Sequence, residues 1–473
     1  MGKNYSAKIV WISLGSILLF TACTKKEAAL PDNLVNFETT AQGITATENS
    51  ISFKVKLSRN TNQNIPLVIK LANTDIAYTT EYTTTPAATG SGEINLTIPS
   101  GNNEASFTVA KVPGVLYDGD ERIVFDIYSS GSPVLIGTNK QLTLSFAELI
   151  ANSSTATIDG GGPTYPNKVF IDLSANRQTS VLRTSWDLGF YTGSDDFRVI
   201  LNSSSAMMAK QIAKDDLNAV TAADTTGFST ELVFSQTAPT TTALPYIDYP
   251  NGDLTKTSIA AVSGTATENK VYIINRGLGV GSPAPQRGWK KIRIIRNAGG
   301  GYTLQHADIA ATSFTSVDIA KDDAYFFKYV SFEGGAVAIE PAKKKWDIAW
   351  TYFSNATDFG GGEVPYLFQD IIVKNRNVEV AKVLTSAKTF EDFNEASLND
   401  ASLGLSWNGS QTAIGSDWRA GGGPTSQPAV RTDRYYIVKD GDNNYYKVRF
   451  TALTQNNERG YPAYESILVK KGG

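Results

Sequence analysis

Two short stretches, Trp186-Asp-Leu-Gly-Phe190 and Trp346-Asp-Ile-Ala-Trp350, share the pattern Trp-Asp-apolar-small-aromatic and start about 160 residues apart. Two further pairs follow in the same order: Tyr272-Ile-Ile-Asn-Arg-Gly277 with Tyr436-Ile-Val-Lys-Asp-Gly441, and Lys291-Ile-Arg293 with Lys447-Val-Arg449. Repeated phrases in one order, at nearly one offset, indicate an internal duplication. We therefore expect residues 166–312 and 313–473 to form two successive copies of one unit. A single composite domain with two similar hairpins is the alternative.

The sequence around these phrases favours strands over helices, so we expect an all-β protein. Lys291-Ile-Arg293 and Lys447-Val-Arg449 alternate polar and apolar residues, as a half-exposed strand does. We expect Trp186 and Trp346 to anchor the core of each copy, because an indole carries roughly 200 Å² of mostly apolar surface.

The chemistry-bearing residues do not form a catalytic pattern. We expect Asp187 and Asp347 to accept hydrogen bonds from backbone or arginine, since their settings are too alike for a separated acid and base. The single histidine, His306, removes most zinc-hydrolase arrangements and any Ser-His-Asp site without it. The net charge of −3, without a basic stripe, argues against nucleic acid as a partner. We therefore expect a protein that is not an enzyme.

The N-terminus carries an export signal. Lys3 and Lys8 precede a short apolar run that ends in Leu19-Phe20-Thr21-Ala22-Cys23. This pattern resembles a bacterial lipoprotein signal, which implies a signal peptide over residues 1–23 and a lipid on Cys23. Acyl chains on Cys23 would hold the protein on the outer-membrane lipid without a spanning helix.

The region after a short tether, residues 24–33, reads as an antiparallel β-sandwich over residues 34–147. Apolar residues recur with period two, as in Ile51-Ser-Phe53-Lys-Val55-Lys-Leu57. Glu81-Tyr82 and Asp118-Gly-Asp-Glu121 give this region a resemblance to Calx-β-type immunoglobulin-like domains. Some of those domains bind calcium, but carboxylates are few here, and a spacer that holds the rest away from the membrane is the other interpretation. A Ser/Gly-rich linker is expected over residues 148–165.

The second copy carries the clearest family resemblance. Trp346-Asp-Ile-Ala-Trp350, Tyr446-Lys-Val-Arg-Phe450 and Glu458-Arg-Gly-Tyr-Pro462 look like the HmuY family of Bacteroidota. The resemblance implies an outer-membrane lipoprotein with an all-β fold that captures haem or a related porphyrin, and a TonB-dependent receptor as a further partner. The founding members use paired axial histidines, which one histidine in the chain excludes.

Other side chains of this sequence are of types that ligate iron in haem proteins. The resemblance places a ligand loop after the first Trp-Asp strand, where Met207 and Met208 stand, and a thioether is able to ligate haem iron. His306 is the next candidate, and Tyr366 in the second copy would bind as a phenolate. Packing is the alternative role for both methionines.

A surface adhesion or glycan-contact module that has lost haem is the rival function. Trp407 and Trp418 lie in Gly/Ser/Asn-rich segments, where an exposed indole often stacks on a sugar. Thr24-Lys-Lys-Glu27 lacks a run of acidic residues after Cys23, so both the cell surface and the periplasmic face of the outer membrane stay open.

Overall fold

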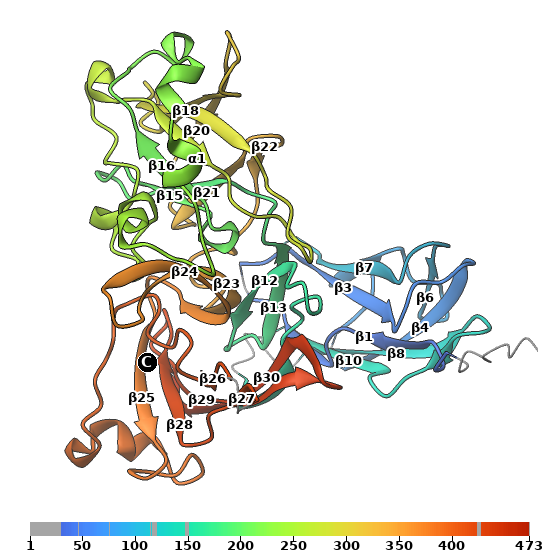
Figure 1. The fold of residues 1–473 in the computed structure, drawn as a ribbon. Coiled ribbons are helices and arrows are strands. Elements are labelled where there is room, and N and C mark those ends of the chain that lie inside the picture. The colour runs from blue at the N-terminus through green and yellow to red at the C-terminus, as the bar shows by residue number, and fades with distance from the viewer. Residues whose placement is uncertain are drawn as a thin grey trace, which may run out of the picture.

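The computed structural model describes residues 30–472, apart from 46, 75, 114, 116–120, 147–150 and 423–426. The signal, Cys23, Asp118 and Asp120 lie outside the described residues. The protein consists of an N-terminal sandwich and a larger C-terminal region, which Figure 1 shows beside each other. The all-β prediction is confirmed, because helices are limited to short turns and α1 (Phe228–Glu231).

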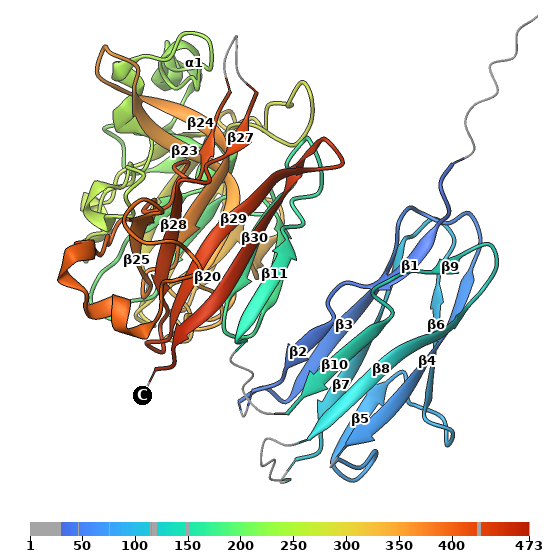
Figure 2. The ribbon, with the colours of Figure 1, turned by 90° about the horizontal axis from the view of Figure 1, so that it is seen from below.

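The N-terminal sandwich is made of two five-stranded sheets, as predicted (Figure 2). The strands of one sheet, in spatial order, are β5 (Tyr82–Thr85), β7 (Glu104–Lys111), β3 (Ser50–Leu57), β1 (Leu34–Phe37) and β9 (Leu135–Ile136). Those of the other are β2 (Ala41–Gly43), β10 (Gln141–Ser145), β8 (Arg122–Ser130), β4 (Ile65–Thr74) and β6 (Glu93–Ile98). The period-two pattern buries Phe53, Phe107 and Phe125 between the sheets, with ring centroids 5.0–5.9 Å apart.

The C-terminal region contains four larger sheets. The first holds β16 (Met208–Gln211), β17 (Tyr272–Asn275), β18 (Trp289–Arg296), β19 (Tyr302–Ala307) and β20 (Thr315–Ile319). The second holds β15 (Val199–Leu201), β14 (Leu188–Tyr191), β21 (Phe327–Ser331) and β22 (Gly335–Val337). The third holds β13 (Arg177–Leu182), β12 (Asn167–Asp172), β23 (Ile348–Asp358) and β24 (Glu363–Lys374). The fourth holds β11 (Ser153–Thr157), β30 (Glu458–Lys470), β29 (Tyr445–Gln455), β28 (Arg434–Lys439) and β25 (Glu379–Leu384), and a two-stranded ribbon joins β26 (Arg419–Ala420) to β27 (Ala429–Val430).

The two copies exchange their opening strands. We expected each copy to open its own sheet, but β12 pairs with β23 and β21 pairs with β14. Ile171 thus lies opposite Ile348, and Val330 lies opposite Leu188. Residues 184–340 consequently hold one complete pair of sheets, and this segment is inserted between the two parts of the other pair. The boundary expected at residue 312 cuts through a sheet, because β20 closes the sheet of β16–β19.

The segment expected to be a linker also takes part in a sheet. β11 lies inside residues 148–165 and pairs antiparallel with β30. The following turn is tightly packed, since a Cβ on Gly160 would lie 2.3 Å from the Trp350 ring. Ser- and Gly-rich composition predicts a linker, but the part of this segment that is rich in Ser and Thr, Ser153–Thr157, is equally suited to an edge strand.

The sheets stack so that three apolar cores separate them. One core, with Leu188 and Tyr302, joins the first two sheets, and another, with Trp350 and Tyr436, joins the last two. The middle core contains Trp186 and Trp346 together and joins the two sandwiches of the C-terminal region face to face. The indoles expected to anchor separate copies therefore share one core.

Candidate functional site

The two Trp-Asp phrases occupy equivalent positions on either side of the middle core. The backbone N–H of Asp187 donates to Val330 and that of Asp347 donates to Ile171, each at 2.8 Å. Each carboxylate accepts a backbone N–H from the exchanged strand: Asp187 from Phe332 at 2.9 Å and Asp347 from Leu173 at 2.8 Å.

One asparagine in each half makes a matching pair of hydrogen bonds to the backbone beside its Trp-Asp phrase. Asn202 donates to the carbonyls of Arg183 and Trp186, both at 2.8 Å. Asn375 donates to the carbonyls of Lys343 and Trp346 at 2.8 and 2.9 Å. The two halves are thus related by a local pseudo-symmetry, and the middle core lies where they meet.

Trp186 and Trp346 are buried but incompletely bonded. Trp186 packs edge-on against Tyr329, with ring centroids 4.7 Å apart, and Trp346 packs edge-on against Phe170 at 5.0 Å. Both indole Nε1 atoms are buried and have no hydrogen-bond partner among the described residues. A buried N–H without an acceptor costs free energy.

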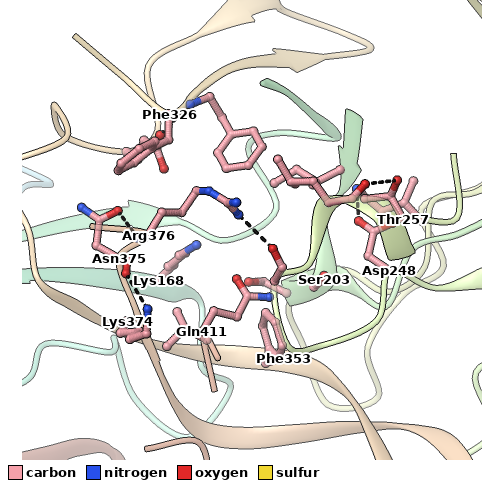
Figure 3. A pocket seen from close by; sticks show the side chains of 18 of the residues that line it. Lys168, Ser203, Asp248, Thr257, Phe326, Phe353, Lys374, Asn375, Arg376 and Gln411 are labelled. Atoms are coloured by element: carbon pink, nitrogen blue, oxygen red, sulfur yellow. Dashed lines mark hydrogen bonds between the residues drawn. The ribbon is translucent and has the colours of Figure 1, made fainter. Parts of the chain in front are cut away.

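Both indoles line one cavity of about 80 Å³ between the two sandwiches. Figure 3 shows Lys168, Arg376 and Gln411 converging on this space from β12, from the end of β24 and from a later loop. Apolar walls come from both halves of the region: Ile200, Leu254, Phe326, Phe327, Phe353 and Val373.

Two lysines in the cavity wall are poorly solvated. Lys168 lies with its ammonium 4.9 Å from the Phe170 ring centroid, and it makes no hydrogen bond or ion pair within the described part of the chain. Burial lowers the pKa of Lys168 to about 8, although the carboxylate of Glu340 opposes this shift. Burial, with a smaller contribution from Arg376, also lowers the pKa of Lys374 to about 8. Lys374 donates only to the neighbouring Asn375 carbonyl, at 3.2 Å.

Three carboxylates line the cavity, and each already has donors. Glu340 accepts from the Phe327 N–H and from the Tyr329 hydroxyl, both at 2.9 Å. Asp248 accepts from the backbone N–H groups of Leu201 at 2.7 Å and Ser258 at 2.9 Å. Asp253 accepts from the backbone N–H and the hydroxyl of Thr255, at 2.9 and 2.8 Å. Burial raises the pKa of Glu340 and of Asp248 to about 7, whereas the bonds from Thr255 lower the pKa of Asp253.

The candidate haem ligands do not converge on one space. Met207 is 1% exposed in the core between the first two sheets, and Met208 is fully buried in a neighbouring core. His306 is 6% exposed on β19, with its ring 5.2 Å from that of Phe332, and burial lowers its pKa. These three residues do not fit an axial ligand role, because none of them lines a described cavity and each is packed on all sides.

Tyr366 is the one candidate that reaches the surface. It lies on β24 between Phe359 and Phe368, with ring centroids at 5.3 and 4.7 Å. Phe359 is 63% exposed. We call Phe359, Tyr366 and Phe368 the aromatic hairpin face, since all three belong to the hairpin of β23 and β24.

The two tryptophans proposed for glycan contact differ in exposure. Trp418 is 1% exposed and donates to the Asp370 carbonyl at 3.0 Å, so its predicted surface position is wrong. Trp407 is 36% exposed, with its ring 5.8 Å from that of Tyr445. The loop composition that suggested exposure did not reveal that Trp418 follows a strand-pairing bridge at Gly415.

Sequence reasoning did not find the cavity. Lys168 and Lys374 read as ordinary polar positions of strands, and Glu340 lies in a polar connection. These three residues lie close together because of the strand exchange, and no local sequence pattern indicates that exchange. In the described part of the chain, no cluster of acidic, histidine or cysteine side chains is suited to a metal ion, and no helix has the length and apolarity to cross a bilayer.

The comparisons with known proteins agree with this fold. The HmuY protein family matches residues 164–465 in a single stretch that covers more than half of the chain. The chain belongs to the HmuY family. None of the curated proteins compared with it is significantly similar.

Two solved structures illustrate the range of similar folds. An apo-form Calx CBD1 domain is 11% identical and covers 25% of this chain and 97% of its own, with a TM-score of 0.21. A putative carbohydrate binding protein from Bacteroides ovatus ATCC 8483 is 10% identical and covers 72% of this chain and 98% of its own, with a TM-score of 0.18. Scores this low carry no argument about ligands.

Proposed function

We propose that the mature chain is a non-enzymatic capture protein that is held on the outer membrane by lipid on Cys23 and binds haem or a related porphyrin. Membership of the HmuY family supports this function. The N-terminal sandwich then acts as a spacer between the membrane and the binding region. Protease treatment of intact cells tests whether the protein faces the exterior, because a periplasmic protein survives it.

The aromatic hairpin face is the place that best suits a porphyrin. Tyr366 offers a phenol that has no hydrogen-bond partner among the described residues, and phenolate is a known haem ligand. Phe359 and Phe368 flank it and offer apolar surface to a flat macrocycle. Tyr366 would hold the iron of a bound haem through its phenol oxygen, while Met207, Met208 and His306 serve in packing.

Titration of the signal-free protein with haemin tests this assignment. We expect a Soret shift in the wild type that is lost or weakened at least tenfold in Tyr366→Phe, because the change removes only the ligating oxygen. A Met207→Leu/Met208→Leu variant keeps the core volume and should bind like the wild type. No Soret shift, or a shift that survives Tyr366→Phe, would contradict the site.

A glycan-contact function is the second candidate, and the exposed indole of Trp407 supports it. Exposed aromatic rings stack on sugars through their faces. Glycan-array binding that Trp407→Ala abolishes, together with an absence of haemin binding, would favour this function over porphyrin capture.

A further inference from the structure

The cavity between the two C-terminal sandwiches has more hydrogen-bond donors than acceptors to spare. Trp186 Nε1, Trp346 Nε1 and Lys168 Nζ have no hydrogen-bond partner among the described residues. Lys374 Nζ uses one of its three protons, on the Asn375 carbonyl. The three carboxylates of the lining, in contrast, accept two bonds each. A molecule that satisfies this surplus must bring acceptors.

The charges of the cavity also favour a ligand that brings acceptors, and specifically an anion. Lys168, Lys374 and Arg376 all line the cavity. The Arg376 guanidinium donates to the Gly252 carbonyl at 2.9 Å and forms no ion pair with a carboxylate of the described residues. Poor solvation makes an unpaired cation costly, and an anion placed among these groups would remove part of that cost. The raised pKa values of Glu340 and Asp248 lower the negative charge that competes for the cations near neutral pH. Asp253, the third carboxylate of the lining, has a lowered pKa and keeps its negative charge, so the three cations face one fully charged carboxylate.

The size and the walls limit the kind of anion. A water molecule needs about 10–15 Å³ of such a cavity, so about 80 Å³ holds a molecule of several non-hydrogen atoms and excludes a porphyrin. Phe326, Phe327 and Phe353 give the wall apolar surface that a fully polar ion such as phosphate does not use.

We propose that this cavity binds a small organic monocarboxylate, with its carboxylate on the lysine ammonium groups and its apolar body against the phenylalanines. Pseudo-symmetry accounts for the pair of indoles, since each half contributes the tryptophan of its own Trp-Asp phrase. This site is separate from the aromatic hairpin face, because Tyr366 does not line the cavity. Its existence therefore does not depend on porphyrin binding.

Nuclear magnetic resonance of the indole N–H groups tests the proposal on the full mature chain. Benzoate is the probe, benzyl alcohol is its neutral counterpart of similar shape, and inorganic phosphate is the fully polar anion. Trp186→Phe and Trp346→Phe assign the two resonances. We expect benzoate to shift both resonances together, with a dissociation constant at least tenfold lower than those of benzyl alcohol and phosphate.

A lysine pair supplies the matched variants. Lys168→Met removes the unpaired ammonium and should weaken benzoate binding about tenfold or more. Lys328→Met is the control on the adjacent sheet, because Lys328 lies outside the cavity and pairs with Asp322 at 3.2 Å, and it should bind like the wild type. Thermal melts of both variants establish that they fold. Unshifted indole resonances at millimolar benzoate, equal binding of benzyl alcohol or phosphate, or full binding by folded Lys168→Met would each overturn the proposal.

Discussion

The two Trp-Asp phrases have the same backbone role but opposite electrostatic surroundings. Asp187 is fully buried and pairs with Arg276 at 3.0 Å and Arg287 at 2.8 Å. Asp347 is equally enclosed, but its neighbours are the carboxylates of Asp172 and Asp440, and no ion pair with it is described. Burial first, and then these carboxylates, raise the pKa of Asp347 well above its usual value.

This difference shows which part of the duplicated phrase the fold needs. In both halves the carboxyl oxygen accepts the N–H that follows the exchanged strand, so the hydrogen bond is the shared requirement. The charge is secondary, because arginines pair with the carboxylate in one half, whereas burial and neighbouring carboxylates raise the pKa of Asp347 in the other half. The exchange of opening strands between the two halves is the larger architectural feature. The largest expected effect therefore comes from an experiment that tests this exchange.

Fragments of the chain should separate the exchanged arrangement from two successive copies. We expect residues 184–340 to fold alone, since β14–β22 include both sheets around the core of Leu188 and Tyr302. Residues 166–312 should remain unfolded, because they lack β20, β21 and β22. Cooperative thermal unfolding, followed by circular dichroism, distinguishes them. A cooperative transition in 166–312 but none in 184–340 would refute the exchange.

The Asp187→Asn variant probes the arginine-neutralised half. It leaves Arg276 and Arg287 buried without their shared carboxylate, and breaking a buried pair costs about 3–5 kcal/mol. We expect the lower part of that range, because Arg276 keeps Glu333 at 2.7 Å. Tryptophan fluorescence in urea isolates the effect, since residues 34–147 contain no tryptophan. A loss below about 1 kcal/mol would mean that the ion pairs contribute little.

The sequence predicted the local features of the fold. It did not predict which distant strands and side chains pair with each other. Alternation was sufficient for the strands and the N-terminal sandwich, and the repeated phrases indicated the two equivalent Trp-Asp positions. The hydrogen bonds of Asp187 to arginine were also expected. Neither Arg276 nor the partner of β12 was predictable, because strand pairing between residues far apart leaves no local periodicity.

The candidate site shows the same limit. Met207 and Met208 follow the first Trp-Asp strand and carry a thioether, but neither property reveals that both side chains are buried. Lys168 was overlooked because an alternating strand explains a lysine without any ligand. Its special property is the absence of a partner, and that is visible only when Trp186, Trp346 and Glu340 are brought beside it.

The Asp347→Asn variant should have the smallest effect and the opposite sign to Asp187→Asn. The amide oxygen still accepts the Leu173 N–H, while the change removes a carboxyl whose pKa is raised by burial and by the neighbouring carboxylates. A carboxyl whose pKa is raised on folding stabilises the protein fully below its unfolded pKa near 3.8, and this contribution is lost as pH rises through the folded pKa. The Asp347→Asn variant has no carboxyl at this position, so its stability does not fall with pH for this reason.

We therefore expect Asp347→Asn to match the wild type near pH 4 and to become more stable at pH 8, by at least about 1 kcal/mol for each unit by which folding raises the pKa. Urea unfolding at several pH values, read from tryptophan fluorescence, measures the difference between the two proteins and cancels the titration of groups they share. A difference that does not grow with pH would show that Asp347 is charged in the folded protein, and the contrast with Asp187 would then rest on the arginines alone.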